Sequence, residues 1–284
     1  MTRDDRKAIF KETIEVVRKG SYISPNGVNH IFVEDEIKHP IANNKPIGLD
    51  ISSLPKRDGT IKVLNADCLY VAEQLVKSGK TCVLNMASFK KPGGGVWNGS
   101  AAQEENLFRR TNLFRSLYQF DNIDYITTHL DEPINGVYPL HPDFGAIYSK
   151  GVTVFRNTEK DNYSLMEDPF IVDFISVSAI KHPPLSSDGH MTRASVERTR
   201  RKIRTMLSMC LQEGVDNVVL GAFGCGAYGT PPSEMAKIFR HVLINEEYAS
   251  RFNAIVFAII DDNNAHREHN PEGNFKPFKD IILS

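Results

Sequence analysis

The chain has 284 residues, enough for one large domain or two small ones with a sizeable hydrophobic core. Hydrophobic residues at 41% and charged residues at 24% are ordinary for a soluble globular protein. A net charge of −1 at pH 7 gives no general attraction to nucleic acid, so we expect no direct nucleic-acid binding.

The four cysteines are scattered along the chain: Cys68, Cys82, Cys210 and Cys225. They form no C-x-x-C pair and have no nearby histidine at zinc-ligand spacing, so we expect reduced thiols in the cytoplasm and no metal or other cofactor. The first residues are charged, unlike a signal peptide, and no apolar run approaches the length of a membrane span. We expect a soluble, intracellular monomer with no membrane contact.

Residues 1–58 are predicted to form an accessory segment packed on a main domain of residues 59–284. An amphipathic helix is expected over residues 4–19, with Ile9, Ile14, Val16 and Val17 available for its apolar face and Gly20 at its end. The next forty or so residues are rich in Pro, Asn, Gly and Asp and contain one short strand candidate at 30–33.

The regular pattern begins with a strand at 61–64, a helix at 69–78 and a strand at 82–84. A strand, a helix and a strand within about 25 residues predict a βαβ unit with parallel strands. Asp67 stands just before the helix and fits an N-cap.

A glycine loop follows the strand that begins at Cys82 and contains Gly93, Gly94 and Gly95. Three consecutive glycines contribute nothing to packing, because glycine has no side chain. They suit a backbone that approaches a ligand closely or leaves amides free for an anion.

The helix after this loop is expected to start with a capping box formed by Ser100 and Gln103. Glu104 and Glu105 then lie in its first turn. Acidic residues favour helix N-termini through the macrodipole alone, but beside a triple glycine they indicate a functional site. Arg109, four residues after Glu105, fits an ordinary surface ion pair.

The chain from 121 to 169 is expected to be rich in loops, with strand candidates at 146–148 and 152–155. Further elements are predicted from their apolar patterns: a buried strand at 170–180, a helix at 194–213 and a last strand at 254–260.

A second glycine-rich loop follows a buried strand and precedes a helix that starts near Pro231; it reads Gly224, Cys225, Gly226, Ala227, Tyr228, Gly229. Amides of such a loop can wrap a diphosphate, with help from the helix N-terminus. The glycines also satisfy the G-x-G-x-x-G dinucleotide fingerprint. The acidic residues about twenty positions on fall at the end of a helix, which disfavours an NAD oxidoreductase.

The first glycine loop resembles the signature of the bacterial-type poly(ADP-ribose) glycohydrolases, which is a triple glycine, six to eight residues, and Gln-Glu-Glu. Here Gly93-Gly94-Gly95 is followed by seven residues, 96–102, and by Gln103-Glu104-Glu105. The resemblance extends over roughly residues 61–263. It implies a macrodomain-like, three-layer α/β/α fold with a mixed, largely parallel central sheet, beside the N-terminal accessory helical segment.

The resemblance also implies roles for individual residues. Glu105 would be the catalytic acid, Glu104 would hold ribose hydroxyls, and Asp67 would hold the adenine. The second glycine loop would lie over the diphosphate and the terminal ribose, with Tyr228 packed on that ribose. The complete set of ADP-ribose-binding residues implied is Asp67, Asn85, Ala87, Gly93, Gly94, Gly95, Gln103, Gly224, Cys225, Gly226, Ala227, Tyr228 and Gly229.

The function implied is hydrolysis of ribose–ribose bonds from the ends of poly(ADP-ribose), or of ADP-ribosylated protein, with release of ADP-ribose and without a metal. Two alternatives remain open: a hydrolase for mono-ADP-ribosylated protein or nucleic acid, and a non-catalytic ADP-ribose reader. The basic residues between Arg193 and Arg204 fit the first alternative, but a solvated helix face explains them equally well.

Overall fold

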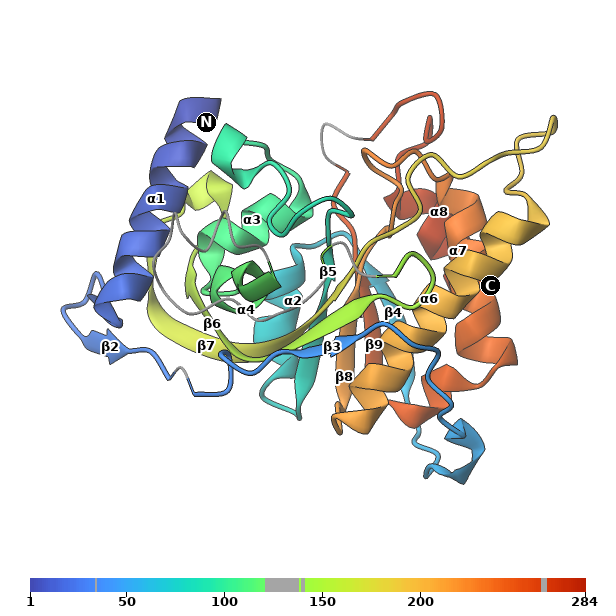
Figure 1. Ribbon diagram of the computed structural model, residues 1–284, viewed down its shortest axis with the longest axis horizontal. Helices are drawn as coiled ribbons and strands as arrows, with labels where there is room; N and C mark the ends of the chain where they lie inside the picture. The colour runs from blue at the N-terminus through green and yellow to red at the C-terminus, as the bar shows by residue number, and fades with distance from the viewer. Residues whose placement is uncertain (34, 121–137, 139–140, 262–264) are drawn as a thin grey trace. The chain divides into compact units, whose positions relative to one another are not determined.

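The computed structural model describes residues 1–33, 35–120, 138, 141–261 and 265–284 (Figure 1). The chain divides into two compact units. The first comprises residues 1–42, 87–140 and 147–176, and the second comprises residues 43–86, 141–146 and 177–284. Residues 1–42 therefore share a unit with the first glycine loop, and the boundary expected near residue 58 stays a prediction.

The N-terminal helix α1, Arg3–Lys19, belongs to the first unit, and its prediction is confirmed. Thr2 and Asp5 form a capping box at its start, and Gly20 ends it in the left-handed conformation. Its buried face contains Phe10, Ile14 and Val17, so the helix packs through one apolar stripe.

A small antiparallel hairpin follows, formed by β1, Ser21–Ile23, and β2, Asn29–Ile31. The strand expected at 30–33 therefore starts and ends slightly earlier. A further short strand, β3, spans Ile41–Asn43.

The long strands of the first unit are β6, Ala146–Arg156, and β7, Leu165–Val177, which pair antiparallel. The two candidates at 146–148 and 152–155 are thus one strand. It contains a register shift between Ser149 and Val152, where Asp173 accepts the Gly151 amide at 2.9 Å. A bulge interrupts the alternation of side chains, which is why the sequence pattern looks like two strands. The expected loops at 121–137 lie outside the described residues.

Helices α3, Gln103–Arg110, and α4, Phe114–Leu117, also belong to the first unit. Helix α1 packs against α3 and against the 3₁₀ turn Val96–Asn98. Phe10 lies edge-on to Trp97, with ring centroids 4.9 Å apart. The N-terminal helix is therefore part of the core that supports the loop around the triple glycine.

Among the described residues of the second unit, parallel strands pair in the order β5, β8, β9, β4. Their bounds are Thr81–Met86, Asn217–Leu220, Ala254–Ala258 and Thr60–Leu64. The helices of this unit are α2, Cys68–Leu75; α6, Arg193–Gln212; α7, Pro232–Arg240; and α8, Phe275–Ile282. The predicted βαβ strands β4 and β5 do run parallel, but β9 and β8 lie between them.

Parallel pairing in the second unit and the antiparallel β6–β7 pair in the first confirm the expected α/β fold with mixed, mostly parallel strands. Among the described residues, no helix is both long and apolar enough to cross a membrane.

Replacing Gly99 by alanine should destabilise the first unit. Gly99 has a φ of +72°, and a Cβ there would lie 2.2 Å from the carbonyl oxygen of Arg3 on α1. Backbone strain and overpacking together predict a loss of roughly 3 kcal/mol in the free energy of unfolding, measured by urea denaturation. Gly27→Ala is the matched control, because Gly27 has a φ of +83° and nothing within 4 Å of its Cβ position. It should lose only about 1 kcal/mol. Equal losses would mean that α1 does not constrain the loop.

Candidate active site

The carboxylate of Glu104 holds the first glycine loop in place. Its Oε2 accepts the amide of Ser88 at 2.7 Å, and its Oε1 accepts the amide of Gly93 at 3.0 Å. Glu104 is only 4% exposed. Two charge-assisted hydrogen bonds to backbone amides therefore fix both ends of the segment from Ser88 to Gly93.

The carboxyl group of Glu105 is held through one oxygen only. Its Oε1 accepts the amide of Gly95 at 2.8 Å. Its Oε2 is buried and has no hydrogen-bond partner within the described part of the chain. The carboxyl group is thus oriented by one bond, while the second oxygen can carry and deliver a proton.

The triple glycine lets the backbone approach these carboxylates. Gly93 and Gly94 have φ values of +73° and +50°, and a Cβ on Gly94 would lie 2.8 Å from Glu105 Oε1. A Cβ on Gly95 would lie 2.3 Å from Ser100 Oγ. Close approach, as expected, is the reason for glycine here.

The expectation of free amides in this loop is wrong. The amides of Gly93 and Gly95 donate to the two glutamates, and the amide of Gly94 donates to the Lys91 carbonyl at 3.2 Å. The anion that this loop holds is the protein's own pair of carboxylates.

The predicted capping box at the start of α3 is also wrong. The N-cap is Ala102, which makes no side-chain cap bond. Ser100 instead donates its amide to the Gly95 carbonyl at 3.2 Å and so closes the turn after the triple glycine. Ser100 therefore belongs to the loop and does not cap the helix as its local sequence pattern had predicted.

Arg109 lies in the core and not on the surface, contrary to expectation. It is 0% exposed, its Nε donates to the Arg6 carbonyl on α1 at 3.2 Å, and its Nη2 donates to the Ser100 carbonyl. Burial lowers the pKa of its guanidinium, and the Glu105 charge acts in the opposite direction. The guanidinium also lies over the ring of Tyr163, 5.8 Å from the centroid. Arg109 therefore ties α1 to the turn that precedes the two glutamates.

The second glycine loop belongs to the second unit. Gly224 and Gly229 have φ values of +77° and +71°. The amides of Gly226 and Ala227 donate no hydrogen bond to any described residue, which matches the predicted free amides. The side chain of Cys225 is fully buried, and burial raises the pKa of its thiol.

The remaining predicted binding residues occupy different environments. Asp67 caps α2, where its Oδ1 accepts the amides of Leu69 and Tyr70, so the N-cap reading is confirmed. Asn85 is fully buried in β5, Ala87 is buried just after it, and Gln103 is half-buried at the start of α3. Sequence reasoning missed Ser88, since nothing in the pattern distinguishes an amide that binds a carboxylate.

Arg198 and Arg204 of α6 are paired with carboxylates. Arg198 binds Asp143 at 2.8 Å, and Arg204 binds Glu246 at 2.7 Å and Glu197 at 3.0 Å. Ion pairs of this kind are typical of a solvent-exposed helix face. Lys202 is buried, and burial lowers its pKa to about 8.

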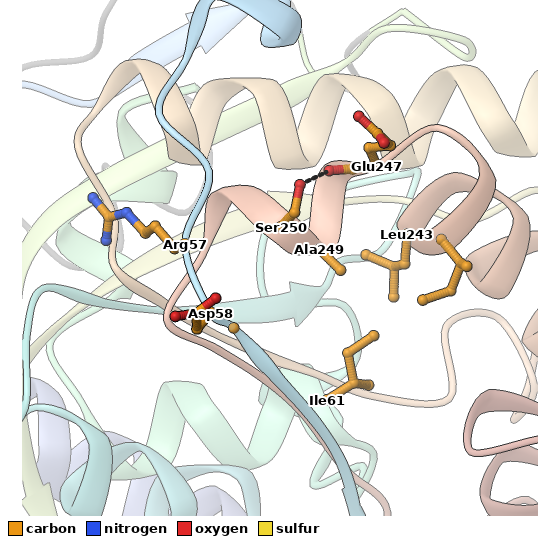
Figure 2. A pocket seen from close by; sticks show the side chains of 9 residues that line it. Arg57, Asp58, Ile61, Leu243, Glu247, Ala249 and Ser250 are labelled. Carbon is orange, nitrogen blue, oxygen red and sulfur yellow. Dashed lines mark hydrogen bonds between the residues drawn. The ribbon is translucent and has the colours of Figure 1, made fainter.

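A pocket of about 420 Å³ in the second unit is lined by residues that include Arg57, Asp58, Leu243 and Glu247 (Figure 2). It contains none of the predicted site residues. Arg57 is bound to Asp216, so its charge is already compensated. Across the described ranges, no group of three or more His, Cys, Asp or Glu side chains could hold a metal ion.

Comparisons with known proteins place the chain in a family. The sequence model of the microbial-type PARG catalytic domain matches residues 10–157. No curated protein sequence matches the chain. Poly(ADP-ribose) glycohydrolase from Thermomonospora curvata, bound to the inhibitor ADP-HPD, is 26% identical, with 96% of this chain and 97% of that chain covered and a TM-score of 0.76.

The enzyme of the same name from Deinococcus radiodurans, in complex with ADP-ribose, is 25% identical. The match covers 87% of this chain and 96% of that chain, with a TM-score of 0.65. Because the family model matches more than half of this chain, the chain belongs to the microbial-type poly(ADP-ribose) glycohydrolase family.

Proposed function

We propose that this chain hydrolyses ribose–ribose O-glycosidic bonds from the ends of poly(ADP-ribose) and releases ADP-ribose, with Glu105 as the general acid. The observation that carries the proposal is the Glu105 carboxyl group, which is held by the Gly95 amide through Oε1. Its Oε2 is buried and has no hydrogen-bond partner among the described residues. The similar Thermomonospora and Deinococcus enzymes bind ADP-HPD and ADP-ribose, which supports the ligand class.

The chemistry requires a proton on the leaving oxygen as the glycosidic bond breaks. Glu105 donates that proton from Oε2, and the bonding electrons leave with the ribose oxygen, so oxocarbenium character develops at the anomeric carbon. Water then adds to this carbon and returns a proton to Glu105. The products are free ADP-ribose and a polymer shorter by one unit.

Glu104 is proposed to hold ribose hydroxyls. A carboxylate has about four acceptor sites, so the amide bonds from Ser88 and Gly93 do not prevent it from accepting a hydroxyl. Those bonds fix its orientation before the substrate arrives.

The other predicted contacts are part of the same proposal. The amides of Gly226 and Ala227 bind the diphosphate, Tyr228 packs on the terminal ribose, and Asp67 holds the adenine. Gly93 to Gly95 contribute through close backbone approach. The free amides in the second loop support the first of these roles.

We propose that the enzyme acts in the cytoplasm, in a reducing environment and without direct nucleic-acid contact. The four cysteines are free thiols, and Arg198 and Arg204 of α6 are paired with carboxylates, which supports both points. The monomeric state stays a prediction that light scattering can check.

Glu105→Gln should lower the rate of ADP-ribose release from poly(ADP-ribose) by at least about 100-fold, because an amide cannot donate the proton. The measurement is chromatography of the products of purified wild type and variant. Binding of ADP-ribose by the variant, followed by calorimetry, should persist. Full activity of the variant on polymer would refute the role of Glu105, and release only from mono-ADP-ribosylated substrates would favour the alternative hydrolase.

The two glutamates should differ in how they tolerate glutamine. Glu105→Gln can keep its carbonyl oxygen on Gly95 and place its amino group where Oε2 has no partner, so stability should change by less than about 1 kcal/mol. Glu104→Gln must turn an N–H toward the amide of Ser88 or Gly93 and should lose roughly 1–3 kcal/mol. Urea denaturation of both variants measures this difference. Equal stability would show that the Glu104 bonds do not hold the loop.

Activity should not depend on a divalent metal. Release of ADP-ribose by protein dialysed against EDTA should match that of untreated protein, because the proposed chemistry uses only a carboxyl group and water. Loss of activity that Mg²⁺ or Zn²⁺ restores would contradict the proposed mechanism.

A further inference from the structure

The second glycine loop is closed at its ends by its own backbone. Thr230 donates its amide to the Gly224 carbonyl at 3.0 Å, and Gly229 donates to the Gly226 carbonyl at 3.1 Å. His182 donates its amide to the Tyr228 carbonyl at 2.7 Å. These bonds hold the start and the end of the loop but leave the peptide between Cys225 and Gly226 without a partner inside it.

That peptide is held from a distant part of the chain. The Cys225 carbonyl accepts from His269 Nε2 at 2.8 Å and from Asn270 Nδ2 at 3.4 Å. Because the acceptor is a carbonyl, His269 must carry its proton on Nε2. Two donors on one carbonyl oxygen fix the direction of this oxygen.

The two donors are themselves anchored. Asn270 is 1% exposed, its Oδ1 accepts the Arg267 amide at 2.8 Å, and its Nδ2 also donates to Asn274 Oδ1 at 2.9 Å. The Asn274 amide in turn donates to Asp261 Oδ1 at 2.6 Å. The turn that presents His269 and Asn270 is therefore anchored by hydrogen bonds within the second unit.

The direction of the Cys225 carbonyl also fixes the direction of the neighbouring Gly226 amide. The peptide group is planar and trans, so its N–H points opposite to its C=O. With the Cys225 oxygen directed at His269 and Asn270, the Gly226 N–H points the other way, and it donates to no described residue. If the peptide flipped, a carbonyl oxygen would replace this N–H and would repel an anion. Glycine at 226 offers little resistance to such a flip.

We propose that His269 and Asn270 are positioning residues that lock the Cys225–Gly226 peptide so that the Gly226 N–H is presented to the diphosphate of ADP-ribose. The inference rests on the proposed function for the identity of the ligand. The locked peptide lowers the cost of ordering the loop on binding, so its effect is expected on affinity and not on the chemical step.

The test compares His269→Ala with His269→Gln, which keeps an N–H donor. Calorimetry with ADP-ribose should show a dissociation constant raised about tenfold in His269→Ala, as expected for one lost hydrogen bond, and largely restored in His269→Gln. On poly(ADP-ribose), KM should rise by a similar factor while kcat changes by less than about twofold. Thermal denaturation verifies that each variant is folded.

His266→Ala is the matched control, because this exposed histidine bonds to the Pro271 carbonyl and not to the loop. It should bind ADP-ribose like the wild type. Unchanged affinity in His269→Ala, or an equal loss in His266→Ala, would overturn the inference. Wild-type binding without hydrolysis would refute the proposed function while the comparison of variants still decides the inference. No binding by the wild type would overturn both.

Discussion

The hydrogen bonds from the amides of Ser88, Gly93 and Gly95 to Glu104 and Glu105 are the contacts on which the arrangement of the first glycine loop depends. They explain the glycines, because a Cβ on Gly94 would lie 2.8 Å from a Glu105 oxygen. They also make the two carboxyl groups unequal: Glu104 is held through both oxygens and Glu105 through one. Two carboxyl groups with different surroundings therefore stand next to each other in one helix turn.

The two glycine loops use their amides in opposite ways. In the first loop, the amides of Gly93 and Gly95 donate to carboxylates of the protein. In the second, the Gly226 amide donates to none of the residues that the structure describes, while the carbonyl before it accepts from His269. Both arrangements fix the direction of a peptide group in advance. A dipole that is already ordered needs no reorganisation when it interacts with a charge.

The N-terminal helix has a direct part in this arrangement within the first unit. Arg109 bonds to the carbonyls of Arg6 on α1 and of Ser100, and Gly99 allows the loop to lie against Arg3. Arg3 and Arg6, which lie in the predicted accessory segment, thus support the turn that leads to the glutamates. The buried guanidinium is retained because its hydrogen bonds and the Tyr163 ring compensate part of the desolvation cost.

The local sequence pattern was sufficient to predict the features that depend on residues close together in the sequence. The helix ending at Gly20, the Asp67 cap and the parallel strands follow from spacing and from residue chemistry. The motif around Glu105 was identified by its resemblance to a family signature. Only the tertiary structure decided which groups the amides of Gly93 and Gly95 would meet and that Arg109 would be buried. It also placed β8 and β9 between β4 and β5, and His269 on the Cys225 carbonyl. These contacts join residues that periodicity cannot relate, because each depends on how distant segments pack and on which partner replaces water for a buried polar group.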